Sequence, residues 1–363
     1  MTFSPQDFTH TDAAGGWAID DEVVQLRGWG TATMYRLPGP PVRDCTVGAA
    51  ETCGLQLDDR SGRVSRLHAR LVRRQTRWLL RDEGSKNGVW IDGARRGELV
   101  LTPGLEIRIG GVTLIAESPL LSALRSFLAR LLGWRNERAG IVDQALRAVR
   151  MAATRRTALV LCGEGDLVPI AQAIHRHVRH SARPFIVCDP RRQAGRATVR
   201  FAENHASGME ALAVAAGGSL CVRSRRLPAD FDRVLERLRD PTSQVQLIVC
   251  AEGSRECERC RVAPIVLPPL ASRADEIDRI IHEYAQDAMI ELEASRSVFQ
   301  AADHDWVRKY AASSLPEIEK ATLRLVALRA SRNLTQAAER LAMAPVSLSR
   351  WIGRRQLPMQ IRQ

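Results

Sequence analysis

Between residues 28 and 117 the chain alternates short apolar stretches with polar turns. The apolar stretches recur about every 8–12 residues, and Gly, Pro or Asn-Gly separates most of them. This spacing is typical of short strands joined by tight turns, so it predicts an all-β sandwich. We expect the strands within residues 31–37, 44–50, 54–59, 68–74, 76–82, 88–93, 97–101 and 105–117.

Helical spacing replaces this alternation after Ser118, beginning with Leu121, Leu124 and Leu128. Strand and helix patterns then alternate, which predicts a parallel α/β core, and only helical patterns follow. We therefore expect a multidomain chain with a sandwich over 22–117, a helical linker over 118–139, an α/β core over 140–270, a helical segment over 271–314 and an all-α C-terminal domain over 315–363.

The chain of 363 residues carries a formal net charge of +12, and its only lysines are Lys86, Lys309 and Lys320. A GC-rich genome explains the preference for arginine over lysine, but it does not explain the excess of positive charge. This excess favours an anionic partner such as nucleic acid or a phosphorylated protein.

Neither a membrane span nor an export signal is apparent in the sequence. No apolar run approaches the roughly 18 residues of a membrane helix, so we expect a cytoplasmic protein without a membrane partner. Most cysteines lie singly in apolar runs, as small core residues do in a reducing compartment. Cys257 and Cys260 form one C-x-x-C without a second pair, so we expect no metal site and no cofactor.

Two stretches of the predicted sandwich, RVSRLHARL and DEGSKNGVWIDG, carry a motif. With Gly48-Ala49 upstream, they resemble the forkhead-associated (FHA) domain, whose pattern is Gly-Arg, then Ser-x-x-His, then Ser/Thr-x-Asn-Gly. The resemblance implies that loops at one end of the sandwich bind a phosphothreonine. The binding residues that it implies are Arg63, Ser65, Arg66, His68, Lys86 and Asn87.

Within this set the resemblance gives four residues a role. Ser65 donates to the phosphate, Arg66 adds charge, His68 braces the loop from behind, and Asn87 bonds the peptide backbone. Ala49 departs from the family because it stands where the arginine of Gly-Arg is usual, and Arg63, Arg66 and Lys86 are candidates to compensate. The alternative is that the loops hold an unphosphorylated partner.

The stretch VLCGEGDLVPIAQAIHR, residues 160–176, begins like a phosphate-binding loop, with a strand, a glycine turn and a helix. No Lys and no Ser or Thr follows the turn. Four fragments occur in the same order as in the AAA+ domain of enhancer-binding activators of sigma-54 RNA polymerase, and they resemble that domain. The fragments are residues 182–189, 215–222, 245–252 and 265–277. The resemblance implies an α/β AAA+ core with a helical lid over 271–314.

Five departures from that family affect ATP chemistry or sigma-factor contact. Asp166-Leu167 replaces Gly-Lys, Arg223-Ser224 replaces the metal-holding Asp-Glu, Glu252 replaces a polar sensor, and Pro316 replaces a lid arginine. The sigma-contacting loop has no counterpart between Asp189 and Gly217. We therefore expect a pseudo-ATPase that retains the strand–turn–helix for packing; an unrelated α/β domain is the alternative.

Residues 318–357 resemble the Fis-type helix-turn-helix on the matching positions Asn333, Ala337, Ala338, Leu341, Leu348 and Ile352. Pro345 suits the first turn of the second helix. We expect Leu348 and Ile352 to pack inward, and Arg350, Arg354 and Arg355 to share an exposed face with Ser347. Val346 is also expected to be exposed. The candidate DNA-binding residues are Ser347, Ser349, Arg350, Arg354 and Arg355.

No acidic residue follows Pro345, as suits a helix in the major groove. Ala342-Met343-Ala344 occupies the turn where glycine is usual, which leaves a packing or dimerisation hairpin as the alternative.

Together these patterns predict a cytoplasmic bacterial transcriptional regulator. It would sense a phosphothreonine protein through its sandwich and bind double-stranded DNA as a homodimer or higher oligomer. Two other functions stay open: an interaction scaffold without specific DNA binding, and a working sigma-54-activating ATPase.

Overall fold

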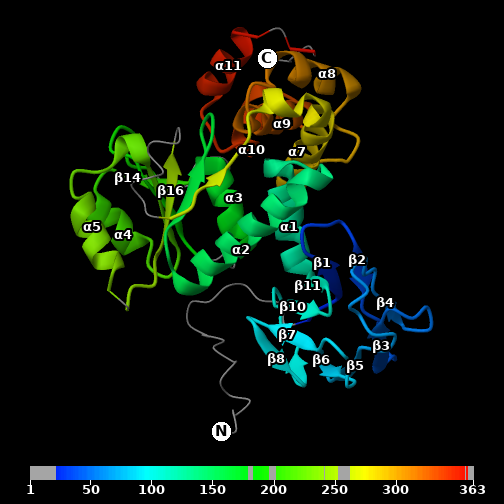
Figure 1. The fold of residues 1–363 in the computed structure, drawn as a ribbon. Helices are drawn as coiled ribbons and strands as arrows, with labels where there is room; N and C mark the ends of the chain where they lie inside the picture. Colours follow the sequence, from blue (N-terminus) through cyan, green and yellow to red (C-terminus); the bar gives the residue numbers. More distant parts are fainter. Residues whose placement is uncertain are drawn as a thin grey trace. The chain divides into compact units, whose positions relative to one another are not determined.

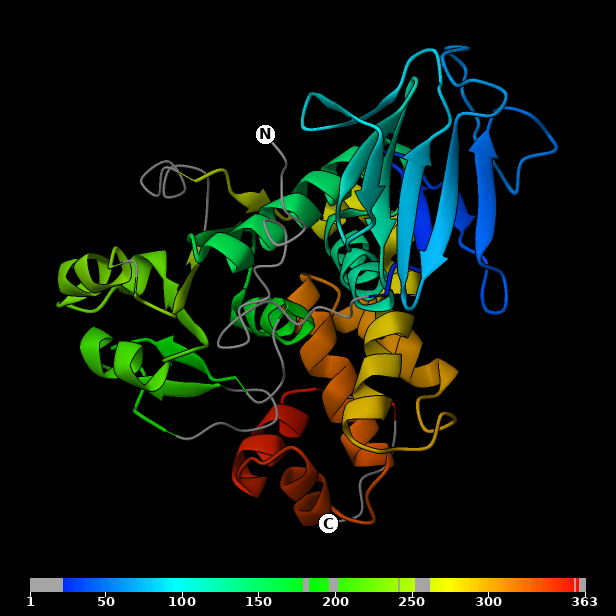
Figure 2. The same ribbon diagram turned by 90° about the horizontal axis from the view of Figure 1, so that it is seen from below.

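The computed structural model describes residues 22–178, 183–195, 202–240, 242–251, 262–355 and 357–358. These residues form two compact units, whose boundary falls after Arg147. Figures 1 and 2 give the course of the chain within them.

The first unit contains a β-sandwich of two sheets. One sheet has the order β2-β1-β11-β10-β7-β8 and the other β4-β3-β5-β6-β9. The strands are β1 (Gln25–Gly28), β2 (Met34–Arg36), β3 (Asp44–Gly48), β4 (Leu55–Gln56), β5 (Ala69–Arg74), β6 (Arg77–Asp82), β7 (Val89–Ile91), β8 (Ala94–Arg96), β9 (Glu98–Val100), β10 (Glu106–Ile109) and β11 (Val112–Glu117).

Alternate side chains of the strands fill the space between the sheets. In β5 and β6 the inward residues include Leu71, Trp78 and Leu80, and in β10 they are Ile107 and Ile109. The predicted sandwich is confirmed, because each stretch expected to form a strand contains at least one, and residues 105–117 contain both β10 and β11. Strands β1 and β8 were not predicted, because a buried arginine interrupts the apolar pattern of β1 and because β8 is polar and exposed.

A buried arginine joins the sandwich to the helices that follow it in the same unit. These helices are α1 (Pro119–Leu132) and the first part of α2 (Ala139–Arg155). Arg27 lies 2.7 Å from Glu117, at the end of β11, and 2.7 Å from Asp143 of α2. Asp143 also accepts the Gly30 backbone N–H at 2.7 Å and pairs with Arg125 of α1 at 3.1 Å. Residues 118–147 are therefore fixed by these contacts to the sandwich.

The second unit begins with a parallel sheet of order β14-β13-β15-β16-β12-β17. Its strands are β12 (Leu159–Cys162), β13 (Phe185–Cys188), β14 (Glu203–His205), β15 (Ser219–Arg223), β16 (Gln246–Ala251) and β17 (Ile265–Val266), and its helices are α3 (Val168–Val178), α4 (Gly208–Val214) and α5 (Phe231–Leu238). Helices α4 and α5 pack on one face of the sheet, and α3 contacts β13, β15 and β16 on the other (Figure 1). Parallel strands covered on both faces are almost entirely apolar, as β12 and β16 are here.

The second unit ends in helices, which are drawn yellow to red in Figure 2. They are α7 (Ile277–Glu291), α8 (Ala301–Tyr310), α9 (Leu315–Arg329), α10 (Leu334–Arg340) and α11 (Pro345–Gly353). Helix α9 packs against α7, α8 and α10. Residues 321–328 of α9 are buried without interruption, on every side of the helix. Within the described residues, α9 therefore has no exposed face along these two turns.

The ion pairs of Arg27 predict a large effect of removing Asp143. Asp143→Ala leaves a buried guanidinium without one of its two carboxylate partners, and breaking a buried pair in this way costs about 3–5 kcal/mol. Hydrogen exchange followed by mass spectrometry should show faster exchange in peptides from β1 and β11. The control is Glu106→Ala, which removes a pair with the exposed Arg147 at 3.6 Å and should cost less than about 1 kcal/mol. Equal effects of the two variants would contradict the proposed role of Arg27.

Candidate functional site

The histidine predicted to brace the sandwich loops is fully buried between them. The Ser65 backbone N–H donates to Nδ1 of His68 at 3.0 Å, and Nε2 of the ring lies 3.1 Å from the carbonyl oxygen of Gly88. Because Nδ1 accepts a bond, Nε2 carries the proton and donates to that carbonyl. One neutral imidazole therefore fixes the loop that contains Ser65 to the turn that contains Asn87.

An aspartate organises each of these two loops from within. Asp59 accepts bonds from the backbone N–H groups of Ser61, Arg63 and Val64 and from the Ser61 hydroxyl, at 2.6–2.9 Å. Burial alone would raise the pKa of Asp59, but the bonds from the Ser61 hydroxyl and from these backbone groups lower it below its usual value.

In the second loop, Asp82 accepts the backbone N–H of Ser85 at 3.0 Å, and the Ser85 hydroxyl accepts that of Gly88 at 2.9 Å. Burial would raise the pKa of Asp82, yet its bonds from Ser85 and the nearby Arg95 lower it. Both carboxylates are thus held in the charged form that keeps their loops in shape.

Two direct bonds bring the predicted binding residues together. The Lys86 backbone N–H donates to the hydroxyl of Ser65 at 3.3 Å, and the Asn87 side-chain amide donates to the Arg63 carbonyl at 2.7 Å. Arg63, Arg66 and Lys86 are exposed. The six predicted residues therefore lie on two adjoining loops, with three cationic side chains toward solvent.

The loop that lacks the family arginine lies against the same residues. The backbone N–H groups of Ala49 and Ala50 donate to the carbonyls of Ser65 and Arg66 at 3.0 and 3.1 Å. A Cβ on Gly48 would lie 2.1 Å from the Arg66 carbonyl oxygen, so only glycine permits this approach. Ala49 itself is half-buried against the core. Position 49 therefore lies beside the loop of Ser65, but its alanine side chain brings no charge there.

Sequence reasoning missed Asp59, Asp82 and Arg95 as parts of this site. Asp59 begins the segment Asp-Arg-Ser-Gly, whose turn-forming composition could have identified it. Arg95 comes from β8 and donates to the Ser85 carbonyl at 3.0 Å. No local signal indicates this contact, because it depends on the pairing of β7 with β8.

At the carboxyl edge of the parallel sheet, charged residues pair with one another. Arg223, the last residue of β15, lies 2.9 Å from Asp166 after β12 and 3.2 Å from Asp189 after β13. Arg226 lies 3.1 Å from Asp189, whose side chain is fully buried. In open α/β sheets ligands bind at this edge. Here, a guanidinium lies between the two carboxylates that could otherwise face a cation.

The loop that follows β12 lies close to Leu267 and Ser314. Leu167 is 2% exposed, and a Cβ on Gly165 would lie 3.1 Å from the hydroxyl oxygen of Ser314, just before α9. The cavity between this loop, residues 267–270 and the start of α9 has a volume of about 20 Å³. Ligand pockets usually have several hundred Å³, so this cavity is smaller than those that hold a small-molecule ligand.

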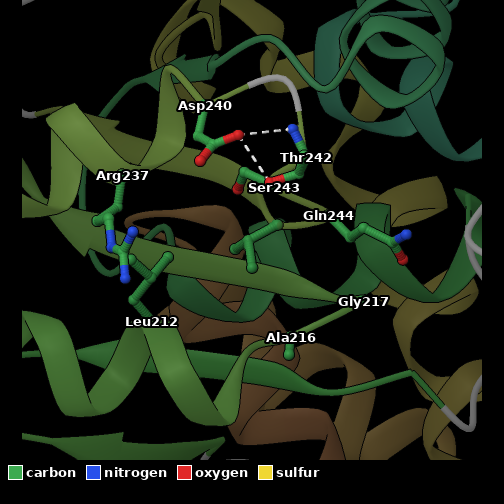
Figure 3. A pocket seen from close by; sticks show the side chains of 9 residues that line it. Leu212, Ala216, Gly217, Arg237, Asp240, Thr242, Ser243 and Gln244 are labelled. Atoms are coloured by element: carbon green, nitrogen blue, oxygen red, sulfur yellow. Dashed lines mark hydrogen bonds between the residues drawn. The ribbon is translucent and has the colours of Figure 1, made fainter.

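A larger cavity of about 400 Å³ lies at the opposite, amino edge of the same sheet (Figure 3). Gly217 and Val245, which precede β15 and β16, line it together with Arg237 and Asp240. The carboxyl ends of α4 and α5 lie here, and such helix ends carry partial negative charge. The carboxylate of Asp240 accepts hydrogen bonds from the backbone N–H and the hydroxyl of Thr242, at 2.8 and 2.7 Å.

Two short helices near the C-terminus bury part of the predicted core. Asn333 caps α10 by accepting the Gln336 backbone N–H at 2.9 Å, and Pro345 is the first residue of α11. Ala337, Ala338, Leu341 and Leu348 are buried where α10 and α11 meet. Ala342, in the turn between them, has a φ of +47°, the left-handed conformation that explains why glycine is usual there.

The end of α11 differs from the prediction. The helix ends at Gly353, so Arg354 and Arg355 do not continue its exposed face, and that expectation is wrong. Arg355 is half-buried, with its guanidinium 5.0 Å from the ring centroid of Trp351. Ile352 is only half-buried, and Trp351 is the residue that packs inward beside Leu348. The side chains that α11 leaves exposed include Val346, Ser347, Ser349 and Arg350, and Arg354 after the helix is exposed too.

Trp351 anchors α11 to the preceding helices. Its ring lies 5.9 Å from that of Trp306 in α8, edge to face, and the guanidinium of Arg324 in α9 lies 5.0 Å from its centroid. Such aromatic and cation–π contacts stabilise a buried ring beyond its area alone.

Several sequence predictions concern residues outside the described ones, among them Cys257, Cys260 and Glu252. In the part of the chain that is described, no cluster of His, Cys, Asp and Glu could hold a metal ion. No helix there is long and apolar enough to span a membrane.

The chain is similar to known FHA domains over part of its length. The FHA-domain family model matches residues 45–110, and no curated protein matches the chain. The FHA domain of FhaA, solved with the intracellular domain of Rv3910, is 27% identical, with a TM-score of 0.23 over 25% of this chain and 96% of its own.

Two further structures have similar coverage of this chain. Mycobacterium tuberculosis EmbR, solved with a low-affinity phosphopeptide, is 28% identical over 26% of this chain and 24% of its own, with a TM-score of 0.24. The N-terminal FHA domain of S. cerevisiae Rad53p, solved with a phosphothreonine peptide, is 22% identical over 26% of this chain and 90% of its own, with a TM-score of 0.23. The match to the family model and the strands within it identify the sandwich. Residues 45–110 form an FHA domain.

Proposed function

We propose that the FHA domain binds a phosphothreonine-containing protein, and that the chain is a transcriptional regulator that couples this binding to DNA recognition. The observation that carries the first part is the joining of two loops by His68, with Arg63, Arg66 and Lys86 exposed beside Ser65. A phosphothreonine carries about −1.5 to −2 charges and three acceptor oxygens. Fixed hydroxyl and cationic donors on rigid loops suit such a group.

In this proposal the three exposed cations take over from the arginine that Ala49 replaces. Asn87 contributes its side-chain oxygen and its second amide N–H, because its first amide N–H already donates to the Arg63 carbonyl. The Ser65 hydroxyl accepts the Lys86 N–H and keeps its own proton for the phosphate. The alternative partner, an unphosphorylated segment, would have no use for the concentration of positive charge at these loops.

We expect Arg66→Ala to weaken binding of a phosphothreonine peptide by about 1.5–3 kcal/mol, the value of one charge-assisted hydrogen bond. Ala49→Arg should strengthen binding, because it restores a cation beside Ser65. Calorimetry against a phosphothreonine peptide library and the matched unphosphorylated peptides measures both effects.

The control is Arg74→Ala, an exposed arginine at the far end of β5 from His68, which should leave binding unchanged. Equal affinity for phosphorylated and unphosphorylated peptides would contradict phosphate recognition and favour the unphosphorylated partner.

The second unit supports a role without ATP turnover. Its resemblance to the AAA+ activators implies a phosphate loop, but Leu167 is buried and Arg223 pairs with Asp166 and Asp189. Magnesium would compete with a tethered guanidinium for the same two carboxylates, and the cavity of about 20 Å³ is far too small for a nucleotide. We infer a pseudo-ATPase that takes no cofactor, with a working sigma-54-activating ATPase as the opposed candidate.

Calorimetry with ATP and magnesium should therefore show no saturable heat in the micromolar range. Saturable binding, or ATP hydrolysis that Asp166→Ala abolishes, would contradict a pseudo-ATPase.

Exposed polar side chains at α11 favour DNA as the second partner. Ser347, Ser349 and Arg350 project from the helix, and Arg354 follows it. The sequence has no acidic residue from Pro345 onward. A short basic helix packed on a preceding one is the arrangement that places a recognition helix in the major groove. Residues 321–328 of α9 are buried within the chain, so a homodimer would have to form through other surfaces.

Arg354→Ala should lower the slope of log affinity against log salt by about one unit, uniformly across DNA sequences, because one phosphate contact is lost. Capture of genomic fragments by the full chain, followed by titration at several salt concentrations, measures this slope. Arg296→Ala, an exposed arginine between α7 and α8, is the control and should leave the slope unchanged. If the parent protein captures no fragment specifically, the interaction scaffold is the better interpretation.

A further inference from the structure

The outward face of α11 carries a single apolar side chain beside a single arginine. Leu348 and Trp351 are buried, and they define the inner side of the helix. At 100° per residue, the positions opposite them are Val346, Arg350 and Gly353. Val346 is 60% exposed, Arg350 is exposed, and a Cβ on Gly353 would meet nothing within 4 Å. This side of the helix is therefore open along its length.

The chemistry of this row is unlike that of an apolar docking face. Ser347 and Ser349 lie on either side of it, and Arg354 follows. The exposed valine lies among hydroxyl and guanidinium groups, on a segment without carboxylates. Such a surface is complementary to a partner that is anionic but carries isolated methyl groups. The major groove is such a surface, because each thymine presents its 5-methyl group there and each guanine presents the N7 and O6 acceptors.

We propose that Val346 and Arg350 determine base specificity, with Val346 contacting a thymine methyl group and Arg350 donating to N7 and O6 of a guanine. The proposal rests on the proposed DNA binding and adds the bases that are recognised. The two residues are four apart, which corresponds to about 6 Å along the helix axis. Base pairs are about 3.4 Å apart, so the thymine and the guanine lie within about two base-pair steps of each other.

The test uses the full chain and duplexes enriched by it from a random DNA pool. In the best duplex, each thymine is replaced in turn by deoxyuridine, which removes only the methyl group, and each guanine by 7-deazaguanine, which removes only the N7 acceptor. We expect one thymine position at which deoxyuridine lowers affinity about three- to five-fold, as expected for one buried methyl group. One guanine position within two steps should lose about 5- to 150-fold.

Variants assign each effect to its residue. Val346→Ala should abolish the response to deoxyuridine but not the response to 7-deazaguanine, and Arg350→Ala should do the reverse. Val346→Thr keeps a methyl group and should retain the discrimination. Ile290→Ala, at an apolar residue 77% exposed on α7, is the matched control and should change neither response.

The outcomes separate the two proposals. DNA enrichment by the parent chain, with deoxyuridine effects that Val346→Ala leaves unchanged, would overturn the specificity proposal while DNA binding stands. Sensitive bases more than two steps apart would overturn it as well. No enrichment of any duplex would overturn DNA binding itself, and the specificity proposal with it.

Discussion

The shape of the candidate phosphopeptide site depends on two hydrogen bonds of one buried ring. His68 accepts from the Ser65 backbone and donates to the Gly88 carbonyl, so the two loops cannot move apart without leaving buried polar groups unpaired. That penalty is about 1–3 kcal/mol for each group. Ser65, Lys86 and Asn87 owe their relative positions to this constraint. The residues that would touch a ligand are thus held by one that does not touch it.

Guanidinium groups between two carboxylates recur in this chain with different consequences. In the first unit, Arg27 joins Glu117 to Asp143 and so fixes the early part of α2 to the sandwich. In the second unit, Arg223 joins Asp166 to Asp189 at the edge where α/β sheets bind ligands. The guanidinium of Arg27 attaches residues that follow the strands to the sandwich, whereas that of Arg223 neutralises two carboxylates at the edge of the sheet.

The absence of an arginine at position 49 changes how the FHA domain would hold a phosphate. Ala49 packs against the core and donates its N–H to Ser65, so the backbone of this loop is kept while the charge is lost. Positive charge is supplied instead by exposed side chains of neighbouring loops, Arg63, Arg66 and Lys86. Solvent screens exposed charges more than buried ones. Binding through such residues is therefore expected to depend more strongly on salt than binding through a buried arginine.

The sequence by itself predicted the sandwich and the parallel sheet, because strand alternation and helical spacing are local properties of the chain. The resemblance of its loop motifs to the FHA domain placed Ser65, His68 and Asn87 in neighbouring loops. Asn333 and Pro345 likewise marked the starts of α10 and α11. The tertiary structure alone decided which distant residues meet. Arg95 reaches Ser85 only through strand pairing, Arg223 reaches Asp166 only through sheet order, and Arg355 turns back onto Trp351 because α11 ends at Gly353. Charged side chains carry no periodic signal for their partners, so their pairings follow from the packed fold rather than from the pattern that produces it.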